Sequence, residues 1–384
     1  MSDDRPDPQS PTRRELMHAV GAALMAAPFL ALALRPARAA TAQPYSTRAI
    51  DLVRHSLVID MLSPLRLDLR DEAYSVPLSD DEAAAFRASG ITGFHHAIGI
   101  GGPDAYEKTL AYFAGWQGFA GRNSSTFALV GKASDLEQAK GAGKAAVIMG
   151  AQNAEHFRSA DDVRAFHQIG MRCAQLTYNS QTLIGSGCTE RVDGGISDYG
   201  AKIIDAMGEV GMLVDVSHCG DRTTLDAIEL AKGPIAITHA NCRALNNHPR
   251  LKTDEAIRKL AAKGGVMGVT GVRMFVSAAE PTTVANIVDH IDHVVKLVGI
   301  EHVGVGSDAD LAGYDAMPAD QRAKLHGFYK SSYAFRDKDD TDGFSGATKI
   351  YSLTEALIAR GYSNANIEAI LGGNFRRLLG AVWH

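Results

Sequence analysis

The chain has 384 residues, of which 46% are hydrophobic and 22% are charged. This composition is typical of a soluble globular protein with one large domain or two smaller ones, and it excludes the fibrous and disordered classes. The formal net charge is −5, so the protein has no electrostatic attraction for phosphates or anionic lipid, and we expect no nucleic-acid partner.

Residues 1–39 are predicted to form a twin-arginine (Tat) signal peptide. Arg13 and Arg14 form the arginine pair, and an apolar run of 16 residues covers 19–34. Ala37 and Ala39 are the small residues of a cleavage site. We therefore expect the mature protein to be periplasmic or secreted. An uncleaved anchor is the alternative, although the run is short for a membrane span. No later segment is long and apolar enough, so no stable membrane span is expected after cleavage.

Strand and helix patterns alternate along residues 46–384. Helical patterns lie at 79–90, 105–119, 160–168, 198–210, 223–231 and 284–298, with Ser79 as a helix N-cap and Gly90 as a terminating glycine. Eight strands that alternate with helices predict a single (β/α)8 TIM barrel of the metal-dependent hydrolase type over 46–384. The predicted strands are 57–60, 91–95, 145–149, 173–177, 213–218, 235–239, 265–269 and 303–306.

Three strand ends carry side chains that bind metals. His218 and His239 end two consecutive strands, and Asp308 follows the last one. The carboxyl ends of barrel strands face a common mouth, so these residues favour a divalent-metal site, with zinc the commonest occupant. The alternative is that each histidine is only a hydrogen-bonded residue at a strand end. His290 and His293 lie on an outer helix, which does not reach the mouth, and are predicted not to be ligands.

The four cysteines show no CxxC spacing. Export would permit disulfides, but a chain of this length does not need them, and we expect mostly buried thiols. The cysteines are Cys173, Cys188, Cys219 and Cys242.

Several motifs, in their order along the chain, resemble the membrane (renal) dipeptidase family, peptidase family M19. They are Leu-Val-Asp-Val-Ser-His ending at His218, Ile-Thr-His ending at His239, His-Pro-Arg ending at Arg250, the strand run ending at Asp308, and a C-terminal signature at 361–363 and 370–375. The chain is identified as a divergent bacterial member. The resemblance implies a (β/α)8 barrel with two zinc ions that cleaves dipeptides, and a homodimer.

The resemblance also implies roles for single residues. His218 and His239 match the histidine ligands of the second metal. Asp308 matches a ligand of the first metal that lies beside the nucleophilic water. Arg250 matches the arginine that holds the substrate carboxylate, which suits a planar, bidentate donor.

The sequence departs from the family's pattern at three strand ends. Residues 61–64 stand where the family's first strand carries a His-x-Asp pair of ligands. Gln152 stands in place of the bridging glutamate, and Tyr178 in place of the histidine that polarises the scissile carbonyl. One imidazole of the adjacent pair His95 and His96 could fill the position of the lost first-strand ligands, with ordinary packing as the alternative.

These departures change the expected metal content. Two divalent ions need several nearby carboxylates, and Asp308 is the one family carboxylate ligand that remains. We therefore expect one zinc rather than two, bound by His218 and His239 with Asp308 or the Gln152 amide oxygen. A single zinc with a bound water can still activate that water near neutral pH.

The expected function is an exported, zinc-dependent hydrolase of dipeptides or related small amides. Asp308 would take the proton of the attacking water, Tyr178 would polarise the carbonyl, and Arg250, with Tyr178 and Asn179, would bind the substrate. Two alternatives stay open. One is a barrel of the same family with non-peptidase chemistry on an amino-acid-like or modified-peptide ligand, and the other is a binding protein that has lost catalysis.

Overall fold

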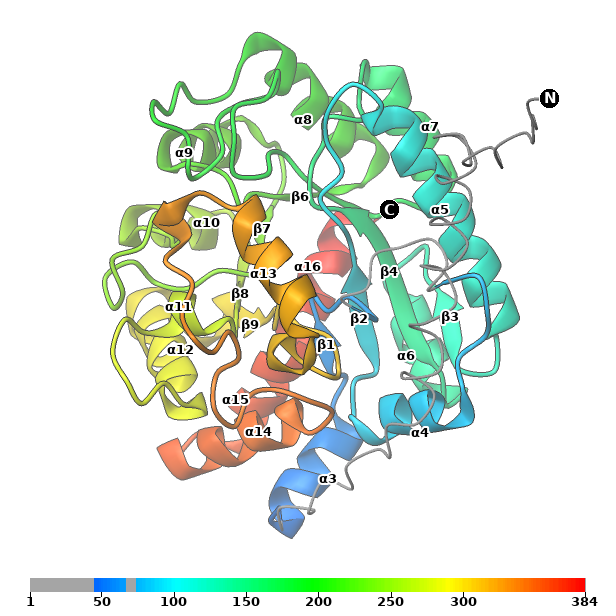
Figure 1. The fold of residues 1–384 in the computed structure, drawn as a ribbon, viewed down its shortest axis with the longest axis vertical. Helices are drawn as coiled ribbons and strands as arrows, with labels where there is room; N and C mark the ends of the chain where they lie inside the picture. Colours follow the sequence, from blue (N-terminus) through cyan, green and yellow to red (C-terminus); the bar gives the residue numbers. More distant parts are fainter. Residues whose placement is uncertain (1–44, 67–73, 384) are drawn as a thin grey trace, which may run out of the picture. The chain divides into compact units, whose positions relative to one another are not determined.

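The structure is a computed structural model that describes residues 45–66 and 74–383. The predicted signal peptide, residues 1–39, lies outside the described residues. Eight parallel strands close into a ring, because β1 pairs with β9 and β2 pairs with β4. Figure 1 shows helices around the strands, which confirms the predicted (β/α)8 fold. The barrel strands are β1 (Ile59–Asp60), β2 (Gly93–His96), β4 (Ala145–Ala151), β5 (Cys173–Gln175), β6 (Leu213–Asp215), β7 (Ala236–Ile237), β8 (Val266–Val269) and β9 (Val303–Val305).

A ninth strand, β3 (Phe127–Leu129), was not predicted from the sequence. It pairs in parallel with the first residues of β4, from Ala145 to Val147. Farther along β4, Gly150 and Ala151 pair with β5, so β3 lies beside the ring and is not part of it. Because Ala128 is half-buried and Leu129 is 41% exposed, β3 lacks the buried apolar run that marks the barrel strands.

The outer layer consists of helices whose ends follow the expected capping chemistry. Ser79 caps α4 in a capping box with Glu82, and Gly90 follows this helix with φ 75°, as predicted. The helices before the last strand are α3 (Thr47–His55), α4 (Asp80–Ala88), α5 (Ala105–Arg122), α6 (Ser134–Gly141), α7 (Ala160–Gln168), α8 (Asp198–Val210), α9 (Asp221–Leu230), α10 (Asp254–Ala262), α11 (Arg273–Val276) and α12 (Val284–Val298). Those after it are α13 (Ala319–Phe328), α14 (Lys349–Arg360), α15 (Asn364–Glu368) and α16 (Asn374–Val382), with a π-helical turn at Ala369–Gly373.

The two histidines of α12 take part in packing. His290 is buried, and its ring nitrogens contact Val276 O and the Cys242 N–H. His293 pairs with Asp254.

All four cysteines are free thiols, three of them buried and Cys188 half-buried. Within the described ranges, the helices are too short or too polar to cross a bilayer.

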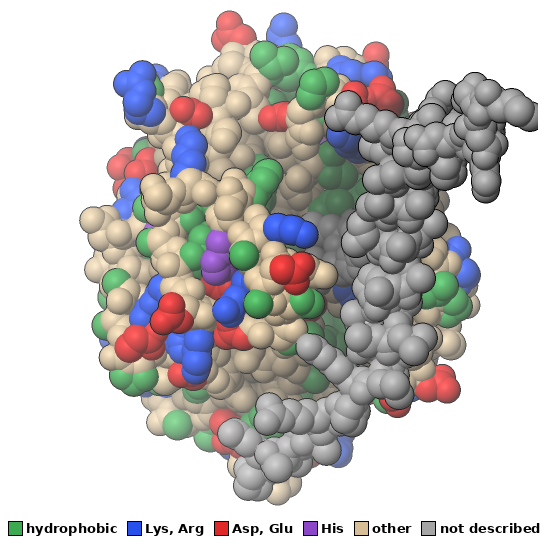
Figure 2. All heavy atoms as spheres, in the orientation of Figure 1, with side chains coloured by type: hydrophobic (Ala, Val, Ile, Leu, Met, Phe, Trp, Pro, Cys, Tyr) green, Lys and Arg blue, Asp and Glu red, His purple; other side chains and the backbone are tan. Residues whose placement is uncertain are grey.

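Residues 309–348, which we call the mouth segment, connect β9 to α14. They contain α13 and two short 3-10 helices, η3 (Tyr314–Ala316) and η4 (Ser331–Tyr333). The mouth segment lies at the carboxyl ends of the strands, because its side chains and the residues after several strands line the same cavity. On the face drawn in Figure 2, hydrophobic, basic and acidic side chains are mixed over this region.

Candidate active site

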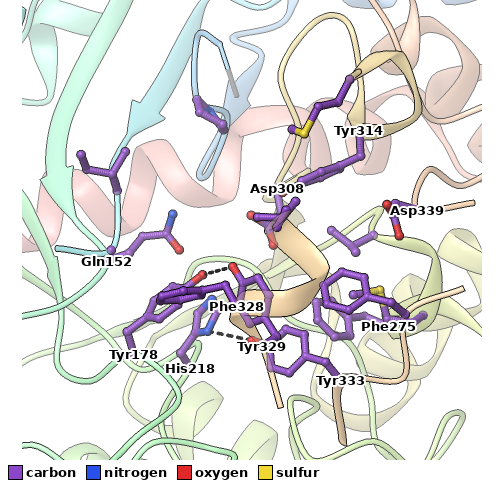
Figure 3. Close-up of a pocket in the computed structure, with 18 of the residues that line it drawn as sticks. Gln152, Tyr178, His218, Phe275, Asp308, Tyr314, Phe328, Tyr329, Tyr333 and Asp339 are labelled. Carbon is purple, nitrogen blue, oxygen red and sulfur yellow. Dashed lines mark hydrogen bonds between the residues drawn. The ribbon is translucent and has the colours of Figure 1, made fainter. Parts of the chain in front are cut away.

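A cavity of about 280 Å³ lies at the carboxyl ends of the barrel strands. Gln152 follows β4, Tyr178 follows β5, His218 follows β6 and Asp308 follows β9, and all four line it. Figure 3 shows their side chains around one space. The parallel strands therefore bring together four of the residues that the sequence singles out.

His218 and His239 form a close pair at this mouth. Their Nε2 atoms face each other at 3.0 Å, and both side chains are buried. The geometry follows from the fold, because β6 and β7 are neighbouring parallel strands and each histidine comes just after its strand. We call these two residues the histidine pair.

Hydrogen bonds fix the tautomer of both rings. The Nδ1 of His218 lies 2.7 Å from Asn179 Oδ1, which can only accept. The Nδ1 of His239 lies 2.7 Å from Thr238 Oγ1, and the Thr238 hydroxyl already donates its proton to the Asp215 carboxylate. Both imidazoles therefore carry their proton on Nδ1, and each turns an unprotonated Nε2 toward the other ring.

Both rings of the histidine pair are held in the neutral form, which is the form that binds metal ions. Burial lowers the pKa of both rings well below the usual value, and the positive charge of Arg250 lowers it further. Both rings are therefore neutral near pH 7, and two nitrogen lone pairs at 3.0 Å repel each other. A divalent cation bound to both Nε2 atoms removes this repulsion, so the pair fits one metal ion as two of its ligands.

The number of metal ions stays a prediction. After β1, where the resemblance implies two ligands, the chain has Met61, Leu62, Ser63 and Pro64. Within residues 45–66 and 74–383, no three His, Cys, Asp or Glu side chains form a group that could hold a metal. Asp308 lines the cavity without completing such a group, so its role as a ligand, like that of the Gln152 amide, stays a prediction.

The adjacent histidines of β2 point to opposite sides of the strand. The ring of His96 packs 3.9 Å from that of Trp116, on the outer side of the barrel. His95 points into the barrel, where its Nδ1 contacts Met61 O at 2.9 Å and its Nε2 has no partner among the described residues. A Cβ at Gly150 would lie 2.1 Å from that Nε2, so the position needs glycine. His96 does not reach the mouth.

Asp308 occupies an unusual backbone conformation. Its φ is 58°, a left-handed value that aspartate tolerates better than most residues, and its N–H donates to Leu62 O at 2.8 Å. Burial raises the pKa of its carboxyl to about 7, and Arg250 opposes this rise. The side chain can therefore exchange a proton near neutral pH.

Tyr178 and Gln152 line the cavity beside the histidine pair. The Tyr178 ring stacks on His218, with centroids 4.3 Å apart, and its hydroxyl lies 2.6 Å from that of Tyr329. Burial raises the pKa of Tyr178 well above its usual value, so the hydroxyl stays protonated. The Gln152 amide nitrogen donates to Ala97 O at 3.1 Å, which fixes the orientation of its side chain.

Arg250 lies behind the histidine pair and is not among the residues that line the cavity. It is fully buried, and its guanidinium donates to the carbonyls of Ser217 and, at 2.8 Å, His239. It supplies positive charge to the site from this position. Its predicted role as the carboxylate anchor stays a prediction.

Sequence reasoning missed the contribution of the mouth segment. Tyr314, Tyr329, Tyr333 and Asp339 all line the cavity, and the Tyr333 hydroxyl donates to Asn179 Oδ1 at 2.7 Å. The available signal was the density of aromatic residues between 328 and 335.

Comparisons with known proteins identify the family of this chain. Residues 47–322 match the family described as Membrane dipeptidase (Peptidase family M19). Dipeptidase tcpJ of Claviceps purpurea is 28% identical over 252 residues, or 65% of this chain and 53% of that protein. Dipeptidase verJ of Clonostachys rogersoniana is 27% identical over 264 residues, or 68% of this chain and 61% of that protein. The chain therefore spans little more than half the length of these curated relatives.

Solved structures share the fold. The crystal structure of an amidohydrolase from Pseudomonas aeruginosa has a TM-score of 0.76 and 27% sequence identity. The match covers 87% of this chain and 99% of the amidohydrolase chain. A second structure is a metallo peptidase from Rhodobacter sphaeroides, liganded with a phosphinate mimic of the dipeptide L-Ala-D-Ala. It has a TM-score of 0.72 and 19% sequence identity, and the match covers 85% of this chain and 99% of that chain. The second likeness supports the fold alone.

Proposed function

Because this chain belongs to the membrane dipeptidase family, peptidase family M19, we propose that it hydrolyses dipeptides or related small amides with the help of one zinc ion. The observation that carries this proposal is the histidine pair, whose unprotonated Nε2 atoms face each other at 3.0 Å beside the cavity. The family implies a metal cofactor, and the identity and number of the ions are part of our proposal.

His218 and His239 would hold the ion. When bound, zinc activates a water molecule as the nucleophile and polarises a carbonyl. The Asp308 carboxylate lines the same cavity and would accept the proton of the attacking water, for which a pKa of about 7 is suitable. The protonated hydroxyl of Tyr178 would donate a hydrogen bond to the carbonyl oxygen of the scissile amide.

We expect purified protein to contain about one zinc per chain, measured by elemental analysis without added metal. His218→Ala should lose the ion, because His239 with at most one side-chain oxygen offers too few ligands to hold it. Asn179→Ala removes the acceptor behind His218 Nδ1 and should weaken zinc binding about ten- to hundredfold. Two ions per chain would contradict the single site, and an ion that His218→Ala retains would show that the histidine pair is not the site.

We also propose that the protein is exported through the twin-arginine pathway and acts in the periplasm or outside the cell, with the homodimer implied by the family as its assembly. Arg13→Lys with Arg14→Lys should leave the protein in the cytoplasmic fraction, because the pathway recognises the arginine pair. Arg5→Lys is the matched control and should be exported. Export of the double variant at the normal level would contradict this proposal, and sedimentation of the purified protein tests the dimer.

One observation favours a second candidate, a binding protein without catalysis. The described residues lack a three-ligand metal group, and the chain after β1 carries Leu62 and Pro64 in place of ligands. Tight binding of a dipeptide without cleavage, in the presence of excess zinc, would favour this candidate. Zinc-independent turnover of a modified peptide would instead favour a family member with different chemistry.

A further inference from the structure

Asp339 is a buried carboxylate of the mouth segment that lines the cavity. Its side chain is 1% exposed. Its Oδ2 accepts from His326 Nε2 at 2.8 Å, whereas its Oδ1 has no hydrogen-bond partner among the described residues. A buried carboxylate oxygen without a donor is costly, and because Asp339 lines the cavity, a ligand bound there can supply the missing donor.

The charges around the cavity indicate which kind of donor suits Asp339. Among the described residues that line it, Asp308 and Asp339 carry carboxylates and there is no lysine or arginine. Burial raises the pKa of Asp339, and its contact with His326 works against that rise. A positively charged donor would offset the remaining desolvation of Asp339. The lining therefore suits an ammonium group better than an anion at this position.

Aromatic rings line the same cavity as Asp339. Phe335 stacks on His326 with centroids 4.0 Å apart, and its ring lies 5.5 Å from that of Tyr329. Tyr329 in turn stacks on Tyr333 at 4.5 Å. The negative faces of such rings attract ammonium groups, and their area suits an apolar or aromatic side chain.

We propose that Asp339 binds the free amino group of the substrate, and that the preferred substrates are amino-acid or peptide amides with an apolar or aromatic side chain. Cleavage of the bound amine rests on the proposed hydrolase function, whereas its binding to Asp339 does not. Hydrolysis would take place at the end of the cavity lined by His218, Tyr178 and Asp308, while Asp339 holds the amino group from the mouth segment.

The test compares two ligands that differ only in an amino group, L-phenylalaninol and 3-phenyl-1-propanol. Neither contains an amide, so neither can be hydrolysed. Calorimetry on the mature protein should show that the amine binds about ten- to hundredfold more tightly, the scale of a hydrogen bond to a charged group. Asp339→Asn should reduce this preference to less than about threefold, because the new amide presents no charge to the ammonium group.

Two variants make the result specific. Asp337→Asn removes the same charge from an exposed position two residues earlier and should keep the full preference. His326→Ala removes the competing donor from Asp339 Oδ2 and should keep or increase it. Equal affinity of both ligands for the unmodified protein would overturn the proposal, as would a full preference in Asp339→Asn.

Hydrolysis of a dipeptide such as Phe-Phe is measured separately. If the amine preference depends on Asp339 but no peptide is cleaved, the binding inference holds and the hydrolase function fails. If peptides are cleaved with no amine preference, the hydrolase function holds and the role of Asp339 fails.

Discussion

Replacing His239 with alanine should nearly abolish peptide hydrolysis and lower kcat/KM by about a hundred- to a thousandfold, the loss expected when one main source of charge stabilisation is removed. The His239 side chain is buried, its Nε2 lies 3.0 Å from that of His218, and its Nδ1 is held by Thr238. The variant removes half of the histidine pair and leaves the strand backbone unchanged. Initial rates on a dipeptide panel measure the effect.

Two measurements keep this result specific to the site. His55→Ala makes the same substitution at an exposed position on α3, and its activity should match the unmodified protein. Circular dichroism should show that His239→Ala is folded. A folded, metal-free His239→Ala protein with full activity would eliminate the metal-hydrolase proposal.

Lys349→Met should lower the free energy of unfolding by about 3–5 kcal/mol, the range for breaking a buried ion pair by removal of one partner. Lys349 Nζ lies 3.2 Å from Asp60 Oδ2, and both side chains are fully buried. The ammonium also donates to Ser307 Oγ at 2.6 Å and Ala309 O at 2.7 Å. Methionine fills the space of the side chain but leaves the Asp60 carboxylate without a counter-charge.

Denaturant unfolding, followed by circular dichroism, measures this change. Adding Asp60→Asn to Lys349→Met should recover part of the loss, because no unpaired charge then remains buried. Lys324→Met is the control, since that side chain is 81% exposed and its removal should leave stability nearly unchanged. A loss below about 1 kcal/mol in Lys349→Met would contradict the importance of the pair.

The strand ends of the site were predictable because parallel strands converge. The apolar runs before His218, His239 and Asp308 are short, bounded by glycine or helix patterns, and end on polar residues. Once eight such strands close into a barrel, their ends must meet at one mouth. Gln152 and Tyr178, which also line the cavity, were singled out only through the family resemblance.

The rest of the cavity depends on contacts that a sequence pattern does not contain. The mouth segment has no regular periodicity, and its path is fixed by distant bonds such as Asp340 accepting from the N–H of Tyr314 at 3.1 Å. The burial of Arg250 likewise depends on two main-chain carbonyls, those of Ser217 and His239. Both arrangements are set by tertiary packing, so neither the position of Asp339 nor that of Arg250 followed from local sequence.

Closure of the barrel by its first and last strands has a consequence during synthesis. Asp60 accepts a hydrogen bond from the Ser307 N–H, 247 residues later, and β1 pairs with β9. At translation rates of about 5–20 residues per second, β1 waits roughly 10–50 s for its partner. Through that interval the nascent sheet has open edges that can pair with other chains. The nascent chain is therefore exposed to strand mispairing until nearly the whole barrel has been synthesised.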